Sequence, residues 1–152
     1  MVNTIFYKND RGELVPLNET LYEKEDHLQL LIEKNPALLA GDQITPDEPR
    51  KWILIAREMG IPDGEDGMLH WSLDHLFLDQ DGIPTLVEVK RSTDTRIRRE
   101  VVGQMLDYAA NGTHYWKIDE IQAMYHGDIC EQLGLSPEQA EDYWSIVDSN
   151  LK

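Results

Sequence analysis

The chain has 152 residues, of which 41% are hydrophobic and 8% aromatic, so it can form one domain with its own core rather than a disordered segment. Its formal net charge of −15 argues against a polyanionic partner, and the single cysteine, Cys130, excludes an internal disulfide framework and a multi-cysteine zinc site. No apolar run approaches the length of a membrane span and the first residues lack a signal-peptide pattern, so we expect a soluble cytoplasmic protein.

The start of the chain is predicted to contain an arm and a helix. Residues 1–19 have apolar segments on both sides of a polar turn, which indicates a small hairpin or an ordered arm. Residues 20–23 (TLYE) have the capping-box pattern. They predict a helix that runs to about Lys34 and stops at Asn35-Pro36.

Three strands are predicted next. The segment from Lys51 to Glu58 has the β-branched and aromatic content of a buried strand, and residues 59–68 after it have the composition of a turn. Leu69–Asp79 and Ile83–Lys90 are then expected to form two antiparallel strands, joined by the turn Gln80-Asp81-Gly82.

The rest of the chain is predicted to be mostly helical. A helix capped by the cluster Ser92–Thr95 runs to about Ala110, with Asn111-Gly112 as its C-terminal stop. Residues 119–152 form a C-terminal helical segment that belongs to the same domain or begins a further region, and its last helix starts at Ser136-Pro137. These elements indicate an α/β domain with a small mixed sheet.

The length of the turn between the last two strands decides which charged side chains share a face of the sheet. A two-residue turn would place Asp74 opposite Val89. A three-residue turn with Gly82 in the left-handed conformation pairs Asp79 with Ile83 instead. We adopt the second register as a hypothesis because the turn ends in glycine.

In this register Asp74 lies directly across from Glu88, and Ser72 from Lys90. Opposed Cβ atoms are only about 4.5–5.5 Å apart, so two carboxylates and a lysine gather on one face while Val89 points to the other. Like charges destabilise a sheet unless something neutralises them, and a hard divalent cation does so well. The simpler interpretation is a half-exposed strand whose charged residues face solvent.

Two predicted helices place polar side chains on apolar stripes. Glu25 shares a stripe with Leu28 and Ile32 in the first helix, and Gln104 shares one with Tyr108 in the second. Each has a simpler interpretation, because Glu25 at the edge of its stripe can reach water and the Gln104 amide can be satisfied by backbone groups.

Basic residues gather in one segment of this acidic chain. Five of the 14 lysines and arginines lie close together with only one acid, Asp94, among them. The Debye length at physiological salt is about 8 Å, so a local basic cluster can outweigh distant carboxylates at contact. The net charge therefore weakens a nucleic-acid hypothesis without excluding it. The five residues are Lys90, Arg91, Arg96, Arg98 and Arg99.

Asp74, a hairpin, the segment Glu88-Val89-Lys90 and a helix with Gln104 and Tyr108 together resemble the PD-(D/E)XK nuclease superfamily in order and spacing. The segments EDHLQLLIEKNPALL and PTLVEVKRS look like those of prokaryotic proteins that carry this restriction-endonuclease-like domain. The resemblance makes residues 20–118 the nuclease-like core and implies an α-β-β-β-α fold, with extra C-terminal helices.

The resemblance implies a catalytic role for five residues, which are Asp74, Glu88, Lys90, Glu25 and Gln104. Asp74, Glu88 and Glu25 would hold Mg²⁺ or Mn²⁺, with the main-chain oxygen of Val89 as a further ligand. Lys90 would orient or help to deprotonate the attacking water and stabilise charge on the phosphate. Such a set suits phosphodiester hydrolysis, because that reaction needs a positioned nucleophile and relief of negative charge.

Residues around this centre are expected to support it. Gln104 and Tyr108 match a helix motif that braces the site or touches the substrate backbone. Phosphate contacts just beyond the site are expected from Arg91, Arg96, Arg98 and Arg99.

The chain departs from the family pattern in two places. Leu73 rather than proline precedes Asp74. The last core strand is missing or reduced to residues 114–118, and the open sheet edge that this leaves could recruit a second copy as a homodimer.

Two functions remain open at this point. The first is a metal-dependent nuclease that acts on DNA, in defence or repair. The second is a non-catalytic nucleic-acid-binding or protein-interaction module on a nuclease-like scaffold. The net acidity and the missing strand favour the second, whereas the joint presence of Asp74, Glu88 and Lys90 favours the first.

Overall fold

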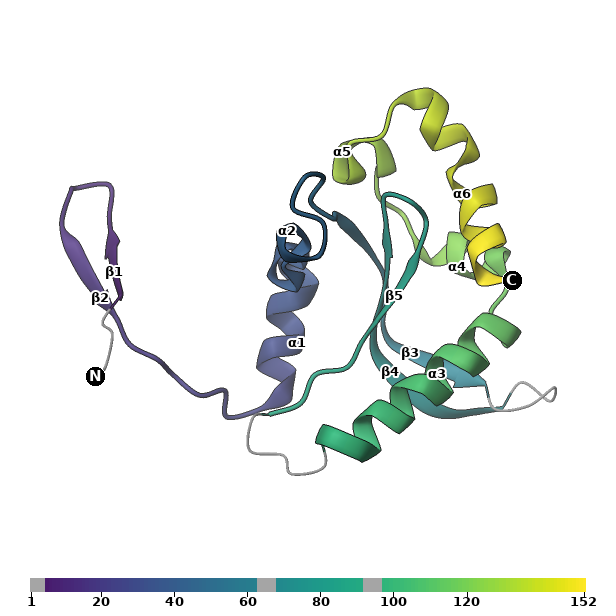
Figure 1. Ribbon diagram of the computed structural model, residues 1–152, viewed down its shortest axis with the longest axis horizontal. Coiled ribbons are helices and arrows are strands. Elements are labelled where there is room, and N and C mark those ends of the chain that lie inside the picture. Colours follow the sequence, from purple (N-terminus) through teal and green to yellow (C-terminus); the bar gives the residue numbers. More distant parts are fainter. Residues whose placement is uncertain (1–4, 63–67, 92–96) are drawn as a thin grey trace.

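The computed structural model describes residues 5–62, 68–91 and 97–152, and it shows a mixed α/β architecture (Figure 1). An N-terminal hairpin stands apart from a body in which helices flank a three-stranded antiparallel sheet. None of the described helices is both long and apolar enough to cross a membrane.

The strands are β1 (Ile5–Lys8), β2 (Leu14–Leu17), β3 (Trp52–Pro62), β4 (Leu69–Asp79) and β5 (Pro84–Val87). The α-helices are α1 (Glu25–Lys34), α2 (Gly41–Ile44), α3 (Val102–Tyr115), α4 (Ile118–Met124), α5 (Ile129–Leu133) and α6 (Pro137–Leu151), with a 3₁₀-helix at Pro36–Leu39 and a π-helix at Ile97–Val101.

The central sheet has the order β3-β4-β5, and both pairings are antiparallel, so the prediction of a mixed sheet is wrong for the described residues. β4 has the predicted limits. β3 continues past its predicted end at Glu58, because Met59 and Ile61 are buried and pair with β4. β5 is shorter than predicted, since it ends at Val87 rather than at Lys90.

Each face of the sheet has its own core. α1 packs on one face, and α3 to α6 pack on the other (Figure 1). Because side chains alternate along a strand, neighbours in β4 belong to different layers: Phe77 faces α1, whereas Leu76 faces the second group of helices. The first core contains Ile32, Trp52, Phe77 and Val89, and the second includes Ile53, Leu76, Leu78, Tyr108, Tyr143 and Val147.

The first helix begins later than predicted. α1 starts at Glu25, so the predicted start at residues 20–23 is wrong, and its N-cap residue, Lys24, makes no side-chain capping hydrogen bond with any described group. The residues before it instead connect the hairpin to α1, and Leu21 in this connection is exposed (Figure 1). The predicted end at Lys34 is confirmed.

The long helix α3 runs through Asn111-Gly112, so the predicted stop at this pair is wrong. Gly112 serves a close contact instead, because a Cβ atom there would lie 2.6 Å from the ring of Trp116. The Trp116 ring N–H in turn donates to the Gly60 carbonyl of β3 at 3.1 Å. Residues 114–118 belong to the end of α3, the beginning of α4 and the connection between them, so of the two alternatives for the last core strand the one that reduced it to these residues is wrong.

The last helix begins as predicted. The Ser136 hydroxyl accepts the main-chain N–H of Gln139 at 3.2 Å, and the Gln139 side chain accepts the N–H of Ser136 at 2.8 Å, with Pro137 in the first turn. The cap predicted for the preceding long helix at Ser92–Thr95 lies outside the described residues.

The turn Gln80-Asp81-Gly82 joins β4 to β5 in the predicted three-residue form. Gly82 has a φ of 70°, in the left-handed region. The Asp79 N–H donates to the Ile83 carbonyl at 3.2 Å, and the Asp79 carboxylate accepts the N–H groups of Asp81 and Ile83 at 2.9 Å each. The register hypothesis is therefore confirmed.

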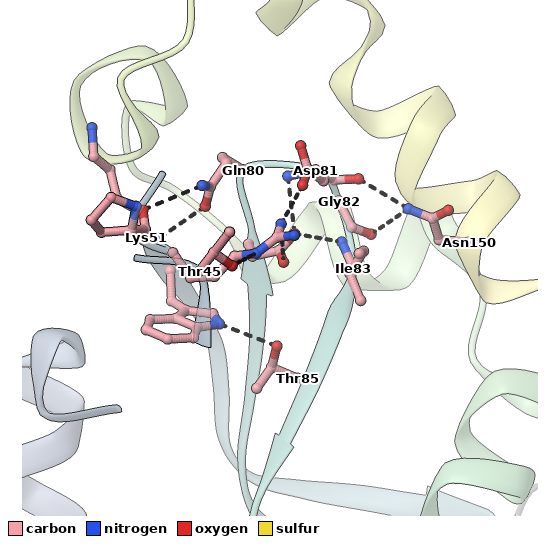
Figure 2. A network of polar contacts seen from close by, with 12 residues as sticks. Thr45, Lys51, Gln80, Asp81, Gly82, Ile83, Thr85 and Asn150 are labelled. Atoms are coloured by element: carbon pink, nitrogen blue, oxygen red, sulfur yellow. Dashed lines mark hydrogen bonds and ion pairs between the residues drawn. The ribbon is translucent and has the colours of Figure 1, made fainter. Parts of the chain in front are cut away.

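Side chains from distant parts of the chain hold this turn (Figure 2). Arg50, just before β3, donates to the Asp79 carboxylate at 2.9 Å and forms an ion pair with Asp81. From α6, the Asn150 amide donates to two carbonyl oxygens of the turn at 3.0 Å each, and the Tyr143 hydroxyl donates to the Asp79 carbonyl at 2.7 Å. The turn is thus fixed by contacts that form only in the folded chain.

We predict that Gly82→Ala lowers the free energy of unfolding by about 2 kcal/mol. The left-handed conformation disfavours a Cβ atom, and this one would meet Val147 at 3.0 Å. Gly103→Ala is the control, because Gly103 lies exposed on α3 with open space around its Cβ position and should gain up to about 1 kcal/mol from helix propensity. Urea denaturation measures both, and equal midpoints for the two variants would contradict the role of the turn.

Candidate functional site

The register of β4 and β5 brings the predicted acids to one side of the sheet. His75 pairs with Val87, so the next step along both chains places Asp74 opposite Glu88. Both carboxylates lie on the side of α3, because Gln104 donates a hydrogen bond to Glu88 and the charges of Glu88 and Asp74 both raise the pKa of Tyr108.

Asp74, in the middle of β4, contacts the chain just past the end of β5, where it separates from β4. Hydrogen-bonded pairs alternate along an antiparallel ladder, so the Val89 N–H would face the main chain of Leu73 if the strands continued together. Instead, Asp74 Oδ2 accepts this N–H at 2.7 Å. The Val89 side chain is buried on the face of α1, as predicted.

The Glu88 side chain is largely enclosed, with only 5% of it exposed. Its Oε1 accepts hydrogen bonds from Lys90 Nζ at 2.6 Å and from Gln104 Nε2 at 3.2 Å. Its Oε2 is buried, and none of the described residues donates a hydrogen bond to it. A buried acceptor without a donor is unfavourable, so this oxygen is the unsatisfied atom of the group.

Lys90 carries a positive charge at neutral pH. Burial lowers its pKa, but the hydrogen bond to Glu88 and the charges of Glu88, Asp74 and Glu25 outweigh this effect, so the pKa is raised above its ordinary value of 10.5. A protonated amine donates hydrogen bonds and neutralises negative charge, but it cannot accept a proton from water. Of the two roles predicted for Lys90, orienting water therefore suits its state better than deprotonating it.

α3 contributes Gln104 and Tyr108 to the same group. Gln104 Nε2 lies 2.6 Å from the Tyr108 hydroxyl as well as within hydrogen-bond distance of Glu88. Burial raises the pKa of the Tyr108 hydroxyl, the hydrogen bond with Gln104 opposes this, and the charge of Glu88 adds to it, so the group is neutral at ordinary pH. Gln104 thus ties α3 to Glu88, and its role in bracing the site or touching the substrate stays a prediction.

Glu25 reaches the edge of this group from the first turn of α1. Its Oε1 accepts the main-chain N–H of Arg91 at 3.0 Å, and its charge contributes to the raised pKa of Lys90. Within the described residues, however, no three His, Cys, Asp or Glu side chains lie close enough to hold a metal ion. The structure therefore brings Asp74, Glu88 and Lys90 together and leaves Glu25 at the periphery.

The predicted basic contacts are described in part. Arg91 is exposed directly after Lys90, and Arg99 is exposed on the π-helix that precedes α3. Arg96 and the side chain of Arg98 lie outside the described part of the chain.

A hollow of about 540 Å³ adjoins Lys90, and the sequence analysis did not predict it. Residues 19–23, Glu25 and Leu28 line one side, and Val89–Arg91 line the other. Residues 20–23 were expected to open a helix, and no local pattern in them indicates a wall beside the site. The hollow exists because α1 starts at Glu25, which leaves the preceding residues outside the helix and beside Lys90.

Comparisons of the chain with protein-family models, with curated proteins and with solved structures give no match. The nuclease resemblance of the sequence therefore stays a prediction, and the site is interpreted from its own geometry.

We predict that Lys90→Met lowers the free energy of unfolding by about 1–3 kcal/mol at neutral pH, because it leaves the Glu88 carboxylate buried without its cation. The raised pKa of Lys90 means that its contribution is fully present below 10.5 and is lost as the pH rises through the higher value of the folded state. The difference between the variant and the natural protein should therefore shrink above that pH, as measured by denaturation at several pH values.

Two controls test this account of the ion pair. The double variant Glu88→Gln/Lys90→Met should recover most of the lost stability, because it removes the unpaired charge. Lys152→Met removes an exposed pair with Asp148 and should change stability by less than about 0.5 kcal/mol. A double variant less stable than Lys90→Met would show that the account is wrong.

Proposed function

We propose that the chain is a metal-dependent nuclease that hydrolyses phosphodiester bonds in nucleic acid, with DNA as the first substrate to test. The observation that carries this proposal is the environment of Glu88. One of its oxygens is held by Lys90 and Gln104, the other has no described donor, and Asp74 lies on the opposite strand. An acid, a second acid and an amine arranged in this way suit phosphoryl chemistry.

The donor set fits Mg²⁺ or Mn²⁺. Mg²⁺ is commonly bound by one or two carboxylates, with waters and substrate phosphates as its other ligands. Glu88 Oε2, the Asp74 carboxylate and the main-chain oxygen of Val89 are the groups that would hold it. When bound, the cation would polarise the phosphate and increase the acidity of a coordinated water.

The remaining residues would position the reactants. The protonated Lys90 would donate a hydrogen bond to the attacking water or to a phosphate oxygen, which offsets the negative charge that develops there. Gln104 holds the Glu88 carboxylate in place through its amide. Arg91 and Arg99 are exposed and suited to phosphate groups farther along the strand.

Binding without hydrolysis is the second candidate, and one observation favours it. Lys90 Nζ lies only 2.6 Å from Glu88 Oε1, so the amine and the acid already neutralise each other. With Glu25 bonded to the main chain of Arg91, the arrangement is also consistent with a static scaffold. The two candidates differ in whether the metal and the amine change the substrate covalently.

We predict that the protein cleaves DNA in Mg²⁺ or Mn²⁺ and that chelation stops it. Glu88→Gln and Lys90→Ala should each reduce the cleavage rate about 100-fold or more, because each removes charge stabilisation at the reacting phosphate. The measurement is cleavage of labelled single-stranded, duplex and branched DNA on denaturing gels.

Matched controls separate the site from general surface charge. Glu141→Gln removes an exposed acid on α6 and Lys117→Ala removes an exposed lysine before α4, and both should cleave as the natural protein does. If substrate stays intact with every metal while DNA binding is equal in all variants, the hydrolytic proposal fails and the binding candidate remains.

Metal binding can be tested without any substrate. We predict that Mn²⁺ binds the natural protein and that Asp74→Asn and Glu88→Gln each weaken its affinity about tenfold or more, because each removes one anionic ligand. Electron paramagnetic resonance of free Mn²⁺ reports the affinity directly, with Glu141→Gln again as the control. Equal affinities in all four proteins would rule out the proposed ligands.

A further inference from the structure

The N-terminal hairpin carries an apolar surface that the rest of the chain leaves uncovered. β1 and β2 project away from the body (Figure 1), and every residue of both strands is exposed. An isolated two-stranded hairpin is only marginally stable in water, and exposed apolar patches of this kind usually mark interaction surfaces.

The cross-strand register divides the hairpin into two faces. Ile5 pairs with Leu17 and Tyr7 with Val15, so these four side chains lie on one face and make it wholly apolar. The four are between 42% and 65% exposed. The opposite face carries Phe6, Pro16 and Leu14 together with the charged Lys8, so it is apolar at three of its four positions. We call the first set, Ile5, Tyr7, Val15 and Leu17, the arm face.

The body of the molecule has a hollow of matching character. A cleft of about 750 Å³ lies where the C-terminal end of α1 and the 3₁₀-helix meet the start of β3 and the connection between α4 and α5. That volume is in the range that accepts a drug-sized ligand, or a few large side chains. Its apolar and aromatic lining includes Pro36, Ala37, Trp52, Leu54, Met124 and Tyr125.

We propose that the arm face of one copy packs into this cleft of a second copy, so that two copies exchange arms reciprocally. The proposal is independent of the proposed nuclease activity. It also differs from a homodimer formed through an open sheet edge, which stays a prediction.

The charge distribution favours a second copy as the occupant. The hairpin contains two basic and two acidic residues and so has no net charge, whereas the whole chain carries −15. Two acidic bodies repel each other, and the neutral arm is the part that can approach a second copy without that repulsion. The cleft is also less acidic than the chain as a whole, since Lys34 and Lys51 line it with one acid, Glu33, and the Arg50 there is paired with Asp79 and Asp81.

The surface area that a dimer would bury favours reciprocal exchange over a contact between two arms. Each side chain of the arm face exposes on the order of 100 Å², so one arm and the surface that it covers would bury roughly 800 Å² together. That is the size of a weak packing contact, and two arms packed on each other would reach no more. Two arms in two clefts would bury about 1,600 Å², which is the size of a standard stable interface.

The test is the mass of the protein in solution, by sedimentation equilibrium at micromolar concentrations. The natural protein should be a dimer, and Tyr7→Lys on the arm face or Met124→Lys in the cleft should each weaken the dimer about tenfold or more. Phe6→Lys is the matched control, because it places the same charge on the opposite face of the same hairpin and should leave the dimer intact.

A mixture of the two variants makes the test specific to reciprocal exchange. The Met124→Lys copy keeps its arm and the Tyr7→Lys copy keeps its cleft, so their mixture should form a heterodimer that is tighter than either variant alone. A monomeric natural protein would overturn the proposal. So would a dimer insensitive to both substitutions, or one that Tyr7→Lys weakens and Met124→Lys does not.

Discussion

The three-residue turn between β4 and β5 is the constraint on which the candidate site depends. Side chains alternate between the two faces of a sheet, so a shift of one residue would turn Glu88 toward α1 and separate it from Asp74. The turn ends in a left-handed glycine and is tied to Arg50 on one side and to Asn150 on the other. Residues far from Asp74 and Glu88 therefore fix the register that brings these acids together. The C-terminal helix α6 contributes to this register through Asn150, although Asn150 binds the turn and not the acids.

The environment of Glu88 is costly for the stability of the fold, but it is of a kind that is common in functional sites. A carboxylate with 5% of its side chain exposed is favourable only if its charge is matched, and Lys90 and Gln104 satisfy one oxygen alone. An apolar residue at this position would make a simpler core. The presence of a half-satisfied buried acid beside a protonated amine is more characteristic of a functional site than of packing.

The register of β4 and β5 could be predicted from the sequence, because it depends on residues that are close together in the chain. Gly82 and the alternation of β4 and β5 were sufficient for the register and for the meeting of Asp74 with Glu88, because both depend on short-range geometry. The limits of the helices were not predictable in the same way. Gly112 has the sequence signature of a helix stop, yet the contact with the Trp116 ring retains it inside α3. This contact forms only in the tertiary fold, so no local sequence pattern predicts it.

The wrong prediction for the start of α1 also comes from a local pattern that the tertiary fold overrides, and it concerns residues beside the candidate site. Residues 20–23 carry a capping pattern, but they form the connection between the projecting hairpin and α1 and line the hollow beside Lys90 and Arg91. A hairpin held by a second copy would restrict this connection, and with it the wall of the candidate site. The exposed arm and the buried acids, which look unrelated in the sequence, are therefore joined by one short segment of chain.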